Sequence, residues 1–353
     1  MRIGQLETPA LIIDLDLFEE NILTMKRLLE KNKLSLRPHY KSHKCPHIAH
    51  IQMKEGAIGI TCAKLSEAED LILSGIDNVL IANQVIEPSK ITRVAYLAHC
   101  CYLTVCVDQQ ENILALETAA AAQGSTIHCL IEYEIGMNRC GVKTPEDFLK
   151  LVKCIEACPH LTFEGIQAYA GNLSHIPDAE IRRRESEKVE QLLGGLKKFI
   201  ETSGYIVKEV SGTSTGTVEY RDTSSVYTEI QAGSYLFMDT AYYALKTNFK
   251  NSLFLLVQAI SVNKDSIIFD AGAKSLSLDQ NSPVFNNYPT ASVGFSEEHC
   301  SIPNIDTKIQ LGDKLLMIPG HCCTTINLHD YIYFVRNEKV IDRVTVRSRG
   351  KSI

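Results

Sequence analysis

The stretch YLTVCVDQQENILALETAAAAQGSTIHCLIE, residues 102–132, holds one full repeat of the pattern that decides the fold. Tyr102–Val107 and Thr126–Glu132 are short runs rich in apolar and β-branched residues, which is typical of buried strands. The segment 109–122 between them has the composition of a helix. A strand, a helix and a second strand in this order predict a parallel βαβ unit.

The same alternation extends outward in both directions, from about residue 35 to residue 235. Eight strands separated by helices predict an α/β fold of the closed (β/α)8 TIM-barrel type, with a doubly wound open sheet as the alternative. Further helices are predicted at Ser66–Leu73, Pro145–Glu156 and Asp178–Thr202. The eight predicted strands are Leu36–Lys41, Ala57–Cys62, Asn78–Ala82, Tyr102–Val107, Thr126–Glu132, Thr162–Tyr169, Val207–Ser211 and Tyr227–Gln231.

Beyond residue 245 the pattern changes to short strands joined by turns rich in Gly, Asn, Asp and Pro, with no amphipathic helix between them. We therefore predict a barrel at 10–244 and an all-β domain at 245–353. Pro9–Asp14 is also strand-like and is followed by a helix at Leu17–Lys31, so the opening of the chain, including residues 1–9, could join this β domain. The predicted C-terminal strands are Ser252–Val262, Ser266–Phe269, Lys314–Pro319, Tyr331–Arg336 and Val340–Val346.

Composition excludes several classes of protein. A net charge of −6 gives no basic surface for nucleic acid or for an anionic membrane. No apolar run approaches the ~20 residues that span a bilayer, and the N-terminus lacks the layout of a secretory signal. The 12 cysteines are therefore expected to be reduced thiols in a cytoplasmic protein, most of them small core residues.

Lys41 is the first candidate for chemistry. It ends the first predicted strand, and barrel enzymes place their sites at the C-terminal ends of strands. Alternation would put Lys41 on one face with Arg37 and His39. A lysine facing a barrel interior is costly unless it is deprotonated, paired or covalently bound, and an imine to pyridoxal 5′-phosphate meets that requirement. The alternative is an exposed lysine in a basic cluster with Arg37 and Lys44.

A phosphate site is predicted on the two loops where barrels commonly bind phosphate, after the seventh and eighth strands. The first loop is Ser-Gly-Thr-Ser-Thr-Gly-Thr at 211–217, and the second is Gly233-Ser234-Tyr235. Glycine lets the backbone approach closely, and N–H and hydroxyl groups supply donors to a dianion. The candidate cofactor-binding residues here are Gly212, Thr213, Gly216, Thr217, Gly233, Ser234 and Tyr235.

Two other strand ends carry side chains suited to the same cofactor. Arg139 follows the fifth strand and could hydrogen-bond the cofactor's phenolic oxygen, or else form a surface ion pair. Tyr169 ends the sixth strand and could stack on a ring, or simply be a core residue. Near the other terminus, His321 and Cys323 offer the N and S donors that zinc favours, although a structural pair is the alternative.

Four segments together resemble one known family. They are RPHYKSHK (37–44), GMNRCGV (136–142), QAGSY (231–235) and PGHCCTT (319–325). In this order they are similar to the D-threonine aldolase and D-serine dehydratase family, pyridoxal-phosphate enzymes with an alanine-racemase-like barrel. The resemblance spans nearly the whole chain, from Thr8 to Arg349.

The resemblance implies roles for the candidate residues. Lys41 would carry pyridoxal phosphate, Arg139, Tyr169 and the two phosphate loops would hold it, and His321 and Cys323 would bind a divalent metal. That metal would be zinc, with manganese and magnesium as alternatives. His175 matches a histidine proposed as a base in the aldolase branch. The family is usually homodimeric, with the β domain completing the partner's site.

The expected activity is that of a lyase acting on a small β-hydroxy-D-amino acid. Cys323 stands where the aldolases have aspartate and the dehydratases have a zinc-binding cysteine, which favours dehydration to a 2-oxo acid and ammonia. Cleavage to glycine and an aldehyde is the alternative. Less favoured are an amino-acid racemase, which has no use for the metal, and a non-catalytic cofactor-binding regulator, which would lack the β domain.

Overall fold

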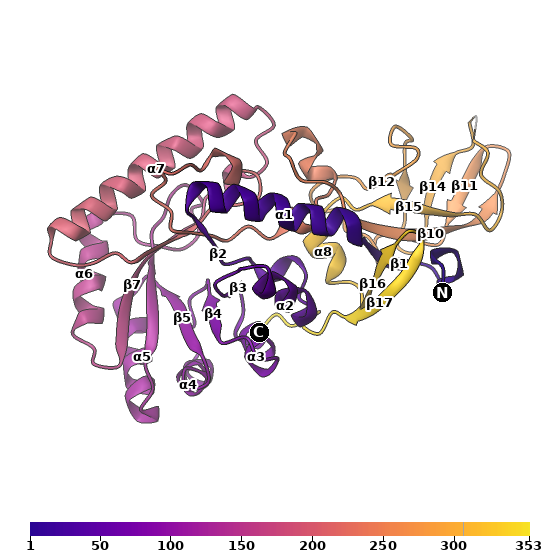
Figure 1. Cartoon of the computed structure of the whole chain (residues 1–353). Coiled ribbons are helices and arrows are strands. Elements are labelled where there is room, and N and C mark those ends of the chain that lie inside the picture. The colour runs from indigo at the N-terminus through magenta and orange to yellow at the C-terminus, as the bar shows by residue number, and fades with distance from the viewer. Residues whose placement is uncertain (306) are drawn as a thin grey trace. The chain divides into compact units, whose positions relative to one another are not determined.

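The chain divides into a barrel unit and a β unit. The computed structural model describes residues 1–305 and 307–353 (Figure 1). The barrel unit consists of 26–41, 48–233 and 351–353, and the β unit of 1–25, 42–47 and 234–350. Residues 10–25, 42–47 and 234–244, which the sequence grouped with the barrel, thus fall with the β unit, and residues 351–353 fall with the barrel unit.

The barrel unit contains, within the described residues, an eight-stranded parallel sheet in the order β2-β9-β8-β7-β6-β5-β4-β3. A parallel bridge between His39 and Thr61, with hydrogen bonds beside it, joins the chain after β2 to β3 and confirms the TIM-type barrel. The strands are β2 (Ser35–Leu36), β3 (Ile60–Cys62), β4 (Asn78–Ile81), β5 (Tyr102–Val107), β6 (Ile127–Glu132), β7 (Leu161–Ala168), β8 (Glu209–Gly212) and β9 (Glu229–Ile230).

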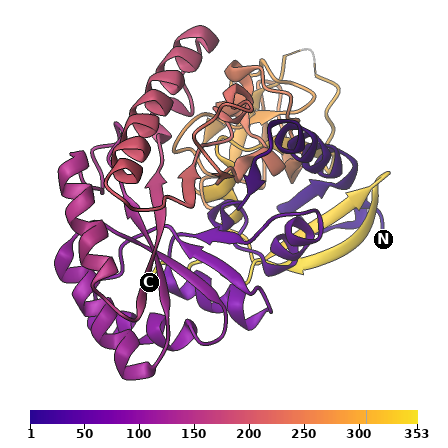
Figure 2. The ribbon, with the colours of Figure 1, turned by 60° about the vertical axis from the view of Figure 1, so that its left-hand side comes forward.

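Helices cover the outer face of this sheet, as Figures 1 and 2 show for the purple to magenta part of the chain. Their ends follow ordinary capping rules: Thr144 and Asp178 accept backbone N–H groups at the starts of α6 and α7, and Gly124 ends α5 at φ +67°. These helices are α2 (Pro46–Lys54), α3 (Leu65–Leu73), α4 (Pro88–Leu97), α5 (Gln110–Gln123), α6 (Pro145–Glu156) and α7 (Ala179–Thr202). Helix α1 (Leu15–Asn32) begins in the β unit and ends in the barrel unit.

The β unit is mostly antiparallel and includes the first strand of the chain. β1 (Ala10–Asp14) pairs antiparallel with β10 (Leu253–Val262) and parallel with β16 (Tyr331–Arg336), so the opening segment joins the C-terminal sheet. One short helix, α8 (Cys322–Ile326), interrupts a region predicted to lack helices. The other strands are β11 (Ser266–Phe269), β12 (Val284–Phe285), β13 (Gly294–Phe295), β14 (Cys300–Pro303), β15 (Lys314–Ile318) and β17 (Lys339–Thr345).

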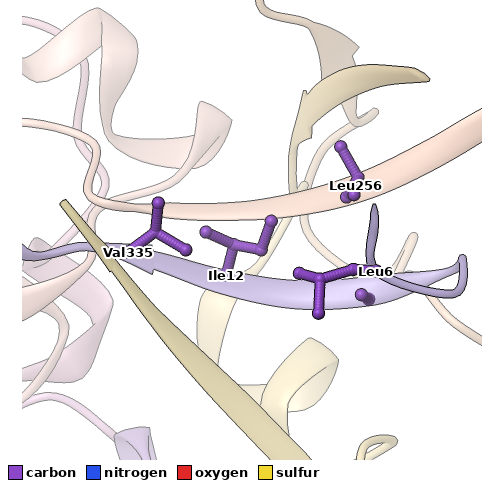
Figure 3. Packing of buried hydrophobic residues seen from close by; sticks show 5 residues of the cluster. Leu6, Ile12, Leu256 and Val335 are labelled. Atoms are coloured by element: carbon purple, nitrogen blue, oxygen red, sulfur yellow. The ribbon is translucent and has the colours of Figure 1, made fainter. Parts of the chain in front are cut away.

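Each unit has its own apolar core. In the β unit, Leu6, Ile12, Leu256 and Val335 pack together around β1, so segments from both ends of the chain share one cluster (Figure 3). In the barrel, Leu80, Cys106 and Leu130 from three neighbouring strands form a second cluster. Cys106 behaves as the small core residue that its apolar strand predicted.

The prediction that a strand runs from Leu36 to Lys41 was wrong in its length. β2 ends at Leu36, and Lys41 lies in a 3-10 turn, Tyr40–Ser42. Pro38 has no backbone N–H to give to a neighbouring strand, which limits regular pairing beyond that point. Lys41 nevertheless follows the first barrel strand, at the end where the sequence placed it.

No helix among the described residues is long and apolar enough to cross a membrane.

Candidate active site

A cavity of about 280 Å³ opens at the C-terminal ends of the barrel strands. Three residues predicted from the sequence, Lys41, Arg139 and Tyr169, line it together. The barrel topology explains this convergence, since parallel strands deliver the residues that follow them to the same edge. The other lining residues are His39, Ala63, Ala82, Asn83, Gln84, Glu132, Cys140, Gln167 and Gln231.

The Lys41 amine lies over the ring of Tyr169, with Nζ 5.2 Å from the ring centroid. The side chain of Lys41 is exposed, so the cost of burial invoked from the sequence does not arise. The backbone N–H of Lys41 donates to His39 Nδ1 at 3.3 Å, which links the two cavity-lining residues. The amine is therefore accessible to a carbonyl compound that enters the cavity.

The prediction that Arg37 lies on the same face as His39 and Lys41 was wrong. Its guanidinium is buried and contacts Glu229 through Nε at 2.9 and 3.0 Å, with Glu209 3.6 Å from Nη2. Glu209 and Glu229 are the first residues of β8 and β9, so this ion cluster lies at the N-terminal ends of the strands. These two carboxylates hold the buried Arg37 guanidinium away from the cavity.

Arg139 is fixed by a carboxylate that the sequence reasoning missed. Its Nη2 lies 3.4 Å from Oε1 of Glu132, the last residue of β6. Glu132 is buried and also accepts a hydrogen bond of 2.6 Å from Gln84 Nε2. The Arg139 guanidinium lies 6.0 Å from the Tyr169 ring centroid, on the same ring as Lys41. Arg139 is thus a half-exposed cation at the cavity, paired with a buried carboxylate.

The loop at 211–217 packs closely against the end of β7. A Cβ at Gly212 would lie 1.9 Å from the Ala168 carbonyl oxygen, and one at Gly216 would lie 2.0 Å from the Ser174 carbonyl oxygen. Both positions therefore require glycine. Among the described residues, the buried hydroxyls of Ser174 and Thr215 have no hydrogen-bond partner. Buried hydroxyls of this kind fit the phosphate of pyridoxal phosphate, whose oxygens would accept from them.

Four predicted residues lie at other places in the chain. Gly233 is the last residue of the barrel unit before the chain returns at 351, and Ser234 and Tyr235 begin a 3-10 turn of the β unit. Tyr235 is buried against Phe249, with ring centroids 5.7 Å apart. His175 follows the 3-10 turn Gly171–Leu173 and is not among the residues that line the cavity.

His321 and Cys323, the pair predicted to bind a metal, lie at the start of α8, where their side chains are hydrogen-bonded to each other. Burial lowers the pKa of His321, but hydrogen bonds to Cys323 and Asp279 outweigh it and raise the pKa to about 9. The Cys323 thiol also lies 3.6 Å from the Ser234 hydroxyl and 3.8 Å from the Cys322 thiol. An imidazole and a thiol suit zinc. In the described part of the chain no third His, Cys, Asp or Glu completes a metal cluster, so solvent or substrate would have to supply the other ligands.

Asp239 anchors this pair from within the β unit. It is fully buried, and its Oδ2 accepts a hydrogen bond of 2.7 Å from the backbone N–H of Cys322. Its Oδ1 accepts from the N–H of Ala241. Burial raises the pKa of Asp239 to about 6.

Some of the functional residues that sequence reasoning missed carry a signal in the sequence, and others do not. Asn83, Gln84, Glu132 and Gln231 are polar residues at the C-terminal ends of predicted strands, and that position alone could have singled them out. Asp279 had no such signal, because it lies 42 residues before its partner His321.

Comparisons with known proteins agree with this architecture. Residues 13–241 match the family model "Alanine racemase, N-terminal domain", and residues 252–335 match "Putative serine dehydratase domain". A 3-hydroxy-D-aspartate aldolase of Paracoccus denitrificans is 36% identical, over 99% of this chain and 93% of its own length. A D-threonine aldolase of an Arthrobacter species is 34% identical, over 99% and 94%.

A dehydratase is related more distantly. The D-threo-3-hydroxyaspartate dehydratase of a Delftia species is 26% identical, over 91% of this chain and 92% of its own length. Among solved structures, a D-threonine aldolase from Filomicrobium marinum superposes with a TM-score of 0.96 at 35% identity, covering 99% of this chain and 98% of that one.

Proposed function

This chain belongs to the D-threonine aldolase and D-serine dehydratase family of pyridoxal-phosphate-dependent lyases, and on that premise we propose that it cleaves a β-hydroxy-D-amino acid to glycine and an aldehyde. The observation that carries this choice is that the relatives with 34–36% identity across the whole chain are aldolases, whereas the dehydratase is 26% identical. The choice departs from the preference for dehydration that Cys323 suggested.

The barrel residues would hold the cofactor and the substrate. Pyridoxal phosphate, held by Lys41, supplies an electron sink for the electron pair that is left on the substrate's Cα. The loop at 211–217 and Gly233 would bind its phosphate, since the hydroxyl of Thr215 in this loop and that of Ser174 beside it are buried and have no hydrogen-bond partner. Arg139, oriented by Glu132, would donate to its phenolic oxygen, and Tyr169 would pack beside it.

Cleavage requires a proton to leave the β-hydroxyl and the Cα–Cβ bond to break. We assign His175 the role of the base, because it matches the histidine proposed as a base in the aldolase branch of the family, and it follows β7 in the chain. His175 takes the hydroxyl proton, the β-carbon leaves as an aldehyde, and Cα gains a proton to give glycine. A divalent metal held by His321 and Cys323 would act as a Lewis acid toward the hydroxyl. The N and S donors favour zinc, with manganese and magnesium as alternatives.

Dehydration is the second candidate, and Cys323 favours it. In that reaction the same β-hydroxyl leaves as water, and the products are a 2-oxo acid and ammonia. We also propose that the protein works as a homodimer, as is usual in the family, which sedimentation or light scattering would test.

Product identification separates the two reactions. The purified protein, supplied with pyridoxal phosphate and Zn²⁺ or Mn²⁺, is incubated with D-threonine, D-serine and 3-hydroxy-D-aspartate. We expect glycine together with acetaldehyde, formaldehyde or glyoxylate, and no turnover of the L-isomers. The Lys41→Ala variant should be inactive.

Accumulation of 2-oxobutanoate, pyruvate or oxaloacetate with ammonia would contradict aldol cleavage and establish the dehydratase. If activity survives complete removal of the metal and one amino-acid enantiomer is converted into the other, the protein is a racemase. This result would contradict both aldol cleavage and dehydration.

A further inference from the structure

Asp279 is held in place by hydrogen bonds from three side chains. His321 Nδ1 lies 3.0 Å from Oδ2 and 3.1 Å from Oδ1 of this carboxylate. The hydroxyl of Thr324 donates to Oδ1 at 3.1 Å, and the hydroxyl of Ser277 donates to the same oxygen. Although the Asp279 side chain is half exposed, its orientation toward His321 is therefore fixed from both sides.

These contacts determine which nitrogen of His321 is available. A carboxylate only accepts hydrogen bonds, so Nδ1 must carry the proton that it shares with Asp279. In a neutral imidazole the lone pair then lies on Nε2. The Cys323 thiol also forms a hydrogen bond with the His321 side chain, and Nδ1 is already engaged with Asp279. Nε2 is thus the nitrogen left to act with the sulfur.

Asp279 is also a poor candidate for a direct ligand. Oδ1 accepts from Ser277, Thr324 and His321, and Oδ2 faces His321 Nδ1. Because Asp279 faces Nδ1, a metal bound to Nε2 would lie on the other side of the imidazole ring from this carboxylate. Histidine ligands in metal sites generally donate their second N–H to a carboxylate or carbonyl, and loss of that partner typically weakens metal binding by about 10–100-fold.

We propose that Asp279 is a positioning residue that fixes the tautomer and ring orientation of His321, so that Nε2 and the Cys323 sulfur form the metal-binding pair. The inference rests on the metal site of the proposed function, but it concerns a residue outside that pair. Asp279, in the turn before β12, would thus strengthen metal binding without contacting the metal.

The test is a set of metal affinities measured on the full chain after removal of metal with a chelator. The Zn²⁺ dissociation constant is measured by competition with a chromophoric chelator, independently of activity. We expect Asp279→Ala to weaken binding by about 10–100-fold. Asp279→Asn should fall between Ala and wild type, because the amide oxygen still accepts the Nδ1 proton without the negative charge. Asp342→Asn, an exposed carboxylate on β17, is the matched control and should leave the affinity unchanged.

The variants also separate this inference from the metal site on which it rests. If wild type binds Zn²⁺ and His321→Ala and Cys323→Ser abolish binding, the metal site stands. Asp279→Ala binding within about twofold of wild type would then overturn the role of Asp279 alone. If His321→Ala and Cys323→Ser bind as wild type does, the metal site itself falls, and the inference with it.

Unfolding of the metal-free variants excludes a general loss of structure. A positioning role predicts that Asp279→Asn weakens metal binding by more than any loss of metal-free stability, measured from the denaturant midpoint, accounts for. If the affinity of this variant falls only in proportion to a loss of metal-free stability, the role is structural and the proposal fails.

Discussion

Glu132 shows how much of the candidate site depends on one buried carboxylate. It accepts from Gln84 at 2.6 Å and lies 3.4 Å from Arg139, so it joins the loops that follow β4 and β6. Arg139 is half exposed, and a long exposed side chain loses rotamer freedom when it is held in one geometry. The charge of Glu132 provides the attraction that opposes this loss.

We predict that Glu132→Gln keeps the fold and lowers kcat/KM by about tenfold, since a hydrogen bond to a charged group contributes about 1.5–3 kcal/mol. Steady-state kinetics and titration with pyridoxal phosphate measure the effect. Glu111→Gln, an exposed residue on α5, is the control. Wild-type kinetics in Glu132→Gln would show that Arg139 does not need this partner.

At the scale of elements, the loop after β8 owes its position to close contacts between backbones. Gly216 is packed against the Ser174 carbonyl oxygen, and Gly212 against that of Ala168, so the loops after β7 and β8 lie directly on one another. The unsatisfied hydroxyls of Ser174 and Thr215 depend on this contact for their shared location.

We predict that Gly216→Ala moves this loop and weakens the binding of pyridoxal phosphate by at least tenfold, because the new Cβ would lie 2.0 Å from a backbone oxygen. Absorbance titration of the cofactor measures the loss. Gly194→Ala in α7 meets no atom within 4 Å and is the matched control. That change should leave binding intact and stabilise the fold by about 0.5–1 kcal/mol. Equal cofactor affinity in both variants would contradict a tightly packed phosphate loop.

The elements that the sequence predicted well are those with a continuous local signal. Each barrel strand is a short apolar run between helical segments, and Pro145–Glu156 was predicted with its observed bounds because Thr144 and Pro145 mark its start. The run at 36–41 was read as one strand because its pattern continues past Pro38. The burial of Arg37 was not predictable, since its partners Glu209 and Glu229 lie more than 170 residues away and at the opposite end of the strands.

Some residues of the candidate site were likewise predictable from the sequence, and others were not. Lys41, Arg139 and Tyr169 were predictable because barrel topology brings strand ends together, whatever the loops do. Asp279 was not, since its role depends on how a turn before β12 meets the start of α8. No periodicity or spacing encodes a contact of that kind.

At the scale of the whole molecule, the ion cluster at the N-terminal ends of the strands makes stability depend on pH. Burial and the neighbouring Glu229 raise the pKa of Glu209 from its ordinary value of 4.5 to about 7, although Arg37 acts in the opposite direction. Between these values the folded chain holds a proton that the unfolded chain has released. The free energy of unfolding therefore falls as pH rises from about 4.5 to 7.

We predict that the wild type loses more stability between pH 5 and pH 8 than Glu209→Gln does, by at most about 3 kcal/mol, because one pKa unit corresponds to about 1.4 kcal/mol. Denaturant unfolding at the two pH values measures the difference. Glu156→Gln, an exposed residue at the end of α6, should change with pH as the wild type does. Identical pH dependence in Glu209→Gln and wild type would show that Glu209 is charged throughout the range.

The pairing of β1 with β10 and β16 has a consequence for synthesis on the ribosome. The barrel strands from β3 to β9 emerge one after another, and each can pair with the strand made just before it. Strand β1 emerges before them all, yet its parallel neighbour, Tyr331–Arg336, is translated last but one among the strands. The nascent chain must therefore carry an apolar N-terminal strand with an unfilled edge through most of translation, which makes this segment the natural target for a chaperone.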